Sequence, residues 1–423
     1  MSEESFLSDD FLRQLISVGD VDLLVGISSH NGQGKVGQFA PAVEEGLLRN
    51  FRRERIALVH MDAGSQNEIE GPVLTESALG KHGGIESLRT LRWITTNSET
   101  AASPDTILRT MLTAVDLLHA KACAVIAPSA EGAIPARVES LLLPIYRENY
   151  DFVAPLYARE KYDALLTRNL LYPICRTLYG KPLRELRAAE FGFSGRLAAH
   201  CLARGEWQNE GWRGGAEMWM AMTAISNSFR CAQTYLGEKS RAASNAGVVE
   251  AIRRTVGGLF WCLESTEAFW LKGPTAERLH TIGPEHQLTN KALRVERKKL
   301  FQMYRSGIAD LAQILETILD METRAELVRL AALEESEFRL SNSLWVRTIY
   351  EFAAAYHHSV INRDHLVQAF VPIYRGRVCS FLSEHRSADS DEMEADLENI
   401  CREFETQKDF FFERWKTKGQ GAS

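Results

Sequence analysis

Three short polar stretches in the first third of the chain have residue types that could bind a ligand. Ser28–Lys35 contains serine, histidine, asparagine and two glycines, Asp62–Ser65 reads Asp-Ala-Gly-Ser, and Ala127–Ser129 reads Ala-Pro-Ser. A carboxylate accepts N–H hydrogen bonds, and a glycine lets the backbone approach a ligand closely. The same residues also suit a turn or a helix cap, so spacing alone leaves both interpretations of Asp62–Ser65 open.

Each of these stretches follows a short apolar run that is typical of a buried parallel strand. The runs are Val21–Ile27, Ile56–Met61 and Ala122–Ile126. Helical periodicity separates them, through Phe39 to Leu48 and through Thr106 to Ala120. Alternating strands and helices predict an α/β fold with parallel βαβ units. Ligands bind beyond the carboxyl ends of such strands, which is where the three polar stretches lie.

The remaining pattern predicts a second, all-helical domain. Further elements are expected as a helix over 137–147, a strand over 150–155, a helix over 165–179, a strand over 191–194, a helix over 216–228 and a strand over 231–236. Residues 66–103 are polar and irregular, and we expect a loop there. From about Gly247 the chain shows long amphipathic segments and no convincing strand. We therefore expect a leader over 1–20 with a short helix, an α/β domain over 21–245, a helical domain over 246–415 and a disordered tail over 416–423.

Composition excludes several classes of protein. The 423 residues are 45% hydrophobic and 25% charged, with a net charge of −7. An acidic chain without a basic stripe is not expected to bind nucleic acid. No apolar run reaches the length of a membrane span, and the acidic start lacks a signal-peptide pattern. Seven scattered cysteines without a CxxC favour reduced thiols, and hence a cytoplasmic protein.

Taken together, these stretches resemble one family, the retaining sugar transferases that make glucosylglycerate or glucosyl-3-phosphoglycerate, and their mannosylglycerate relatives. The segments that carry the resemblance are Val25–Asn31, Asp62–Ser65, Ala122–Ile126, Tyr150–Asp163, Tyr172–Lys181, Glu190–Gly195, Leu344–Ala353 and Val360–Leu366. It extends from about residue 20 to 415. It implies a GT-A-type, Rossmann-like nucleotide-sugar domain with a mixed, mostly parallel sheet, followed by a helical domain.

The resemblance also implies roles for individual residues. Those beside the nucleotide are Ser29, Asn31, Asp62, Gly64 and Ser65, and the acids near the sugar and the acceptor are Glu190 and Glu217. The acceptor side includes Tyr162, and Arg187 carries a charge that suits an acceptor carboxylate or phosphate. The expected donor is a nucleotide sugar, and the expected acceptor is small and acidic.

The metal site of the resembled family is replaced in this sequence. Members of that family carry Asp-x-Asp and a later histidine that hold Mg²⁺ or Mn²⁺, where this chain has Ala127, Ser129 and Arg241. Hard cations prefer oxygen ligands, mainly carboxylates, and a guanidinium would repel them. An aspartate of the family corresponds to Arg213. We therefore expect no bound metal.

Three functional hypotheses follow and stay open. The chain could be a transferase-like protein that is impaired or inactive because the metal ligands are gone. It could be an active, metal-independent transferase in which Arg213, Lys239 and Arg241 replace the cation at the diphosphate. It could be a non-catalytic binding partner of an active relative. The resemblance implies self-association, so a homodimer or a hetero-association is expected.

Two eye-catching residues have simpler explanations. Asn362 precedes a helical pattern and suits an N-cap. Trp219 lies in an apolar helix, and we expect it to pack in the core.

Overall fold

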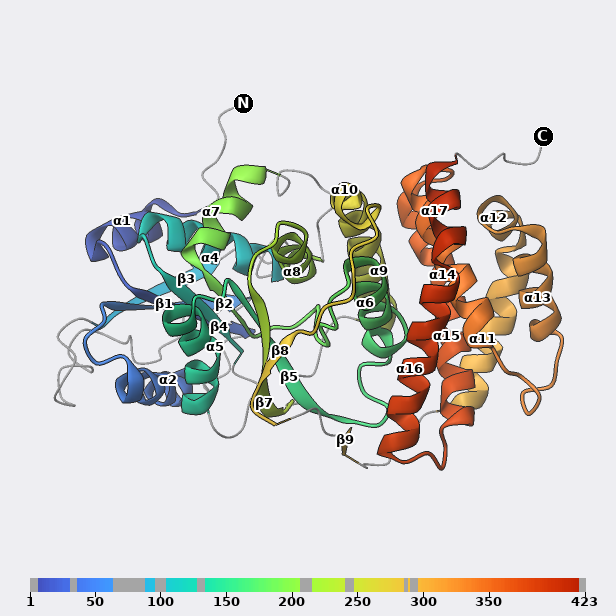
Figure 1. Cartoon of the computed structure of the whole chain (residues 1–423), viewed down its shortest axis with the longest axis horizontal. Helices are drawn as coiled ribbons and strands as arrows, with labels where there is room; N and C mark the ends of the chain where they lie inside the picture. The colour runs from blue at the N-terminus through green and yellow to red at the C-terminus, as the bar shows by residue number, and fades with distance from the viewer. Residues whose placement is uncertain are drawn as a thin grey trace. The chain divides into compact units, whose positions relative to one another are not determined.

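The structure is a computed structural model, and it describes residues 7–30, 36–63, 88–95, 104–127, 134–205, 215–239, 247–284, 288–289 and 296–417. The chain forms two compact units, each made from several segments (Figure 1). The first unit comprises residues 1–157, 185–243 and 279–286, and the second comprises residues 158–184, 244–278 and 287–423.

The first unit alternates strands and helices, as the sequence predicts. Its elements are α1 (Asp9–Val18), β1 (Leu23–His30), α2 (Val36–Asn50), β2 (Ile56–Ala63), β3 (Leu88–Thr95), α4 (Pro104–Leu117), β4 (Ala122–Ile126), α5 (Ile134–Glu148), β5 (Phe152–Glu160), β6 (Phe191–Ser194), α7 (Gly195–Arg204), α8 (Ala216–Ser226), β7 (Cys231–Glu238) and β8 (His280–Ile282). The last three residues of β5 belong to the second unit.

The sheet is mixed and mostly parallel, which confirms the predicted fold class. Its strand order is β3-β2-β1-β4-β6-β5-β7-β8. β1 pairs in parallel with both β2 and β4, whereas β6 runs antiparallel to β4 and β5. The chain moves outward from β1 to β3 and then returns to β4 on the other side of β1. This change of direction creates a topological switch point at the carboxyl ends of β1 and β4.

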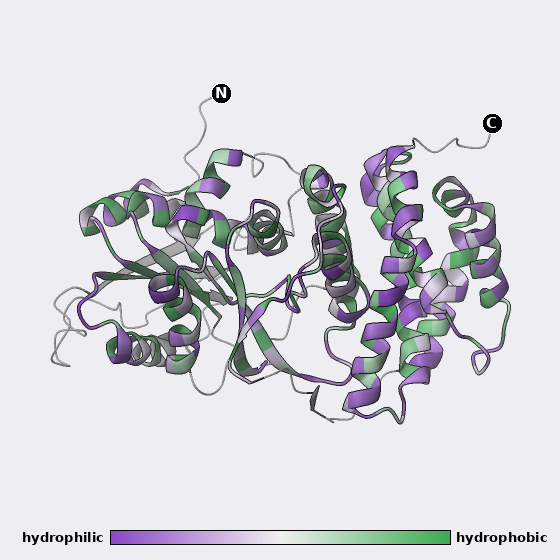
Figure 2. Ribbon diagram, viewed as in Figure 1, coloured by the Kyte–Doolittle hydropathy of each residue, from purple (hydrophilic) through white to green (hydrophobic). Residues whose placement is uncertain are grey.

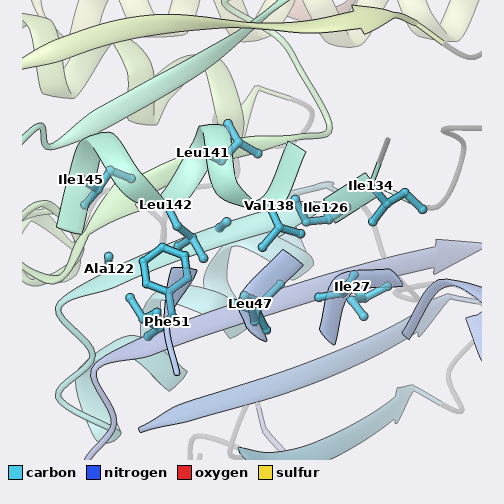
Figure 3. Close-up of a cluster of buried hydrophobic side chains, with 14 of the residues drawn as sticks. Ile27, Leu47, Phe51, Ala122, Ile126, Ile134, Val138, Leu141, Leu142 and Ile145 are labelled. Carbon is cyan, nitrogen blue, oxygen red and sulfur yellow. The ribbon is translucent and has the colours of Figure 1, made fainter. Parts of the chain in front are cut away.

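One cluster of buried residues in the first unit lies between the central strands and the helices α2 and α5 (Figure 3). Ala122–Ile126 is buried at every position, because both faces of the strand are covered. Leu141 and Ile145 of α5 pack into this core. Gly192 of β6 lets α5 approach, since a Cβ there would lie 2.6 Å from the Leu141 carbonyl oxygen. That close approach places α5 directly against β6.

The second unit is built mainly of helices. They are a π-helical turn η1 (Thr167–Leu171), α6 (Tyr172–Tyr179), α9 (Val248–Ser265), α10 (Glu267–Trp270), α11 (Arg297–Asp310), α12 (Ala312–Ile318), α13 (Met321–Ala331), α14 (Asn342–His357), α15 (Arg363–Glu384), α16 (Ser390–Thr406) and α17 (Lys408–Lys416). Many of them carry hydrophilic and hydrophobic residues in alternation along the ribbon (Figure 2). Asn362 caps α15 through bonds from two backbone N–H groups, as predicted.

Several sequence-based expectations need correction. The stretch predicted as loop contains β3, which pairs with β2. Strands also occur after residue 247, because β8 pairs with β7 and the two-residue β9 (Leu288–Thr289) pairs with β5. The segment 158–184 groups with the second unit and 279–286 with the first, so the units are not contiguous in sequence.

Trp219 is 1% exposed and packs in the core, as expected.

No helix in the described part of the chain is long and apolar enough to cross a membrane.

Candidate functional site

The carboxyl edge of the sheet brings two of the predicted nucleotide-binding positions together. Ser29 of β1 and Asp62 of β2 are direct partners in the parallel register. Ile126, the last residue of β4, pairs with Ile27 of β1, so Ala127 follows at the same edge. The three polar stretches noted in the sequence therefore begin at one end of three adjacent strands, at the switch point.

Several predicted site residues lie outside the described part of the chain. These are Asn31, Gly64, Ser65, Ser129, Arg213 and Arg241. Ala127 is described, and its buried methyl group offers no metal ligand. Among the described residues, no group of three or more His, Cys, Asp or Glu side chains is arranged to hold a metal ion.

A buried ion pair lies near the N-terminal end of α5. Nη1 of Arg137 donates to Oε2 of Glu190 over 2.8 Å, and Nη2 donates to the carbonyl oxygen of Glu238 over 2.8 Å. The hydroxyl of Tyr157 donates to the same Oε2 over 2.7 Å. All three side chains are at most 5% exposed. Burial and the Glu190 charge raise the pKa of Tyr157, so it stays a donor.

The second oxygen of Glu190 is not used by this arrangement. Oε1 is buried and has no hydrogen-bond partner among the described residues. A buried carboxylate oxygen that is left without a donor is costly, so it marks a place where a ligand or water can donate. The sequence predicts Glu190 as an acid near the sugar and the acceptor. Its Oε2 accepts bonds from Arg137 and Tyr157, and its Oε1 is available to a ligand or water.

Glu217 is the second predicted acid, and its environment favours proton exchange near neutral pH. It lies in the first turn of α8, a helix buried along its whole length, and is 7% exposed. Burial raises its pKa from 4.5 to about 7, against the lowering effects of the Arg187 and Lys239 charges. Its Oε2 has no hydrogen-bond partner in the described part of the chain. Glu217 can therefore carry or accept a proton at physiological pH.

The charges of two cationic side chains and one carboxylate act on Glu217. Lys239, the residue after β7, is exposed, and its Nζ lies 5.5 Å from the ring centroid of Tyr157. Arg187 is half-buried and is the strongest charge acting on Glu217. Asp105, at the start of α4, acts in the opposite direction and accepts from the N–H of Ala216 over 3.2 Å. The charges of Arg187 and Lys239 thus both act on the Glu217 carboxyl.

Tyr162 belongs to the second unit. Its hydroxyl donates to the carbonyl oxygen of His385 over 3.0 Å, and burial raises its pKa. This contact gives Tyr162 a place in the packing of the second unit, and its predicted acceptor role stays a prediction.

The sequence prediction overlooked Arg137 and Tyr157. A usable signal was present, because Arg137 lies on the apolar face of α5 with Ile134, Val138 and Leu141. An arginine on a buried helix face needs a partner.

Comparison with known proteins gives structural similarity only. No family model and no curated protein sequence matches the chain. A solved structure of glucosyl-3-phosphoglycerate synthase from Mycobacterium tuberculosis, in complex with Mn²⁺, UDP and phosphoglyceric acid, is 17% identical with a TM-score of 0.39. The match covers 59% of this chain and 80% of that one. Mannosyl-3-phosphoglycerate synthase from Rubrobacter xylanophilus is 15% identical with a TM-score of 0.37, over 61% of this chain and 79% of that one.

Both structures are of synthases of the kind that the sequence resembles. Similarity at these scores assigns no activity or ligand to this chain.

Proposed function

We propose that the first unit binds a nucleotide sugar at the carboxyl edge of its sheet, with side-chain cations in place of a metal ion. The observation that carries this proposal is the position of the Lys239 ammonium, 5.5 Å from the ring of Tyr157, whose hydroxyl donates to Glu190. The charges of Arg187 and Lys239 also lower the pKa of the buried Glu217 carboxyl. A nucleotide sugar offers the matching chemistry, because its diphosphate needs positive charge and its hydroxyl groups donate to carboxylates.

The nucleotide belongs beside β1 and β2. The paired positions Ser29 and Asp62 support this placement, since they lie next to each other at the switch point. Asn31, Gly64 and Ser65 follow directly in sequence and complete the proposed set. A carboxylate at position 62 would accept an N–H of the base.

The diphosphate belongs beside Lys239. Arg213 and Arg241 are the further cations that we propose there, from the sequence. Fixed cations would stabilise negative charge on a departing nucleoside diphosphate. Arg187 is proposed to face a small acidic acceptor, because a guanidinium binds carboxylate or phosphate through two bonds.

Impaired or absent sugar transfer is the expected consequence of the replaced metal ligands. Ala127 and Ser129 stand where the resembled synthases have carboxylates, so one source of charge stabilisation is missing. Under this proposal the chain retains donor binding, alone or as a partner of an active relative.

A second candidate, metal-independent transfer, is favoured by Glu217. In that reaction the acceptor hydroxyl oxygen forms a bond to the anomeric carbon of the sugar. The bond between the anomeric carbon and the diphosphate oxygen breaks at the same time. Glu217 takes the hydroxyl proton, and the nucleoside diphosphate leaves beside Lys239. A carboxyl with a pKa of about 7 and a buried, unpartnered oxygen suits that proton transfer.

Calorimetric titration with UDP-, GDP- and ADP-sugars, with magnesium and with a chelator, tests the proposal. We expect binding of one donor in both conditions. Binding that requires magnesium would contradict the metal-free site, and no binding of any donor would reject the proposal. Product formed in chelator that disappears in Glu217→Gln would select metal-independent transfer. Donor binding without product would select the impaired transferase.

A further inference from the structure

Arg137 connects parts of the first unit that are far apart in sequence. Its two guanidinium nitrogens contact Glu190, 53 residues away, and the carbonyl of Glu238, 101 residues away. Both bonds measure 2.8 Å, and the side chain is 5% exposed. A guanidinium can satisfy two acceptors at once in a fixed geometry, which a lysine ammonium on a flexible stem does less well.

The Glu238 carbonyl marks the point where the chain leaves β7. Glu238 is the last residue of that strand, and Lys239 follows it. Because a peptide unit is planar, fixing the Glu238 carbonyl also fixes the N–H of Lys239 and the direction in which the chain continues. The bond from Arg137 therefore helps to fix the backbone position from which the Lys239 side chain extends.

A second contact orients the lysine from the other side. The Lys239 ammonium lies 5.5 Å from the centroid of the Tyr157 ring. The Tyr157 hydroxyl is held by the same Glu190 oxygen that Arg137 contacts. The backbone before Lys239 and the ring beneath its ammonium thus depend on one buried ion pair.

Resting on the proposed function, we propose that Arg137 is a positioning residue that holds Lys239 beside Glu217, where the lysine faces the diphosphate of the donor. The Arg137–Glu190 pair supports this placement, because the two side chains are buried and bonded to each other over 2.8 Å. The charges that face Glu217 from neighbouring elements are those of Arg187, Lys239 and Asp105.

The variants are chosen to separate positioning from folding. Arg137→Lys keeps the charge but loses the two-pronged contact. Arg137→Met combined with Glu190→Gln removes both charges, which leaves no buried ion unpaired. Arg147→Met is the matched control, because Arg147 lies on the same helix but is exposed and contacts Glu54 at the surface.

The first readout is the titration of the Glu217 carboxyl in ligand-free protein, followed by NMR with ¹³C-labelled glutamate and assigned by its loss in Glu217→Gln. We expect the Glu217 pKa to rise in Arg137→Lys and in the double variant, as in Lys239→Met, because the lysine no longer lowers it. Adding Lys239→Met to Arg137→Lys should cause no further rise. The control should titrate as the wild type does.

The second readout is the dissociation constant for UDP, which should rise roughly tenfold in the same variants and stay unchanged in the control. Folded variants whose Glu217 titration and UDP affinity both match the wild type would overturn the positioning role. If Arg137→Lys fails to fold, the double variant decides. If the wild type binds none of UDP, GDP and ADP, the proposed function fails, while the ligand-free titration still decides whether Arg137 positions Lys239.

Discussion

The guanidinium of Arg137 lies 2.8 Å from Oε2 of Glu190, and both side chains are almost fully buried. This pair occupies the region where α5, β6 and the end of β7 meet. Because Tyr157 donates to the same oxygen, Glu190 receives two donors on one side and keeps its other oxygen available. The pair therefore links the packing of the first unit to the proposed donor site.

Breaking this ion pair should destabilise the protein strongly. Arg137→Met alone leaves the buried Glu190 carboxylate without its cation, and we expect a loss of about 3–5 kcal/mol in the free energy of unfolding. Urea denaturation measures it. The double variant Arg137→Met with Glu190→Gln should lose less than the single variant. The Arg147–Glu54 pair is the control, because the Arg147 side chain is 55% exposed, and Arg147→Met should cost less than about 1 kcal/mol. Equal losses in the two single variants would contradict the assignment.

Glu217 should make stability depend on pH. Its pKa is raised from 4.5 to about 7 in the folded protein, so the folded state binds this proton more tightly than the unfolded state. The resulting stabilisation is complete below about pH 4.5 and is lost as pH rises through 7. Glu217→Gln removes the effect, which amounts to roughly 3 kcal/mol. Unfolding measured between pH 5 and 8 should show a smaller decline for the variant than for the wild type. An equal decline of the free energy of unfolding with pH in the wild type and the variant would contradict the raised pKa of Glu217.

Lys239→Met should weaken donor binding without unfolding the protein. Lys239 is exposed and its ammonium contacts the Tyr157 ring, so its removal should change the free energy of unfolding by about 1 kcal/mol or less. A lost charge-assisted contact to a phosphate should raise the dissociation constant for UDP roughly tenfold. Lys121→Met is the control, because Lys121 is an exposed lysine that precedes β4 and pairs with Asp22. An equal effect of both substitutions would point to general charge rather than to a site.

Gly192→Ala should disturb the contact between β6 and α5. The added methyl would lie 2.6 Å from the Leu141 carbonyl oxygen and 2.7 Å from Cδ1 of Ile145, so the helix must move. Such overpacking typically costs about 1–3 kcal/mol. Gly257→Ala in α9 is the opposite case, because a Cβ there would lie 3.8 Å from Cγ2 of Val367, which is an ordinary van der Waals distance. That change should stabilise by about 0.5–1 kcal/mol, since alanine favours a helix interior. Thermal denaturation compares the two, and a stabilised Gly192→Ala would refute the close-packing argument.

The sequence predicts the central strands because a strand that is buried on both faces consists of a continuous run of apolar residues. The apolar run Ala122–Ile126 predicts β4 with the bounds that the structure has. β3 was missed because Arg89 and Arg92 interrupt its apolar residues, and a strand at the end of the sheet order tolerates such residues. β8 was missed because three residues give no readable alternation.

The candidate site was only partly predictable for a different reason. Ser29 and Asp62 could be placed together, because parallel strands bring their carboxyl ends to one edge. Arg137 gained its role from partners 53 and 101 residues away, and nothing local in α5 specifies them. The raised pKa of Glu217 likewise depends on tertiary burial, which α8 acquires only in the folded unit.

The central claim is that side-chain cations replace the metal ion in binding a nucleotide sugar. The most direct test is the dissociation constant of UDP-glucose, measured by calorimetry in magnesium and again in excess EDTA, with GDP- and ADP-sugars as alternatives if UDP-glucose does not bind. The account predicts the same constant in both conditions and a weaker one in Lys239→Met. A constant that is measurable in magnesium and lost in EDTA would contradict it.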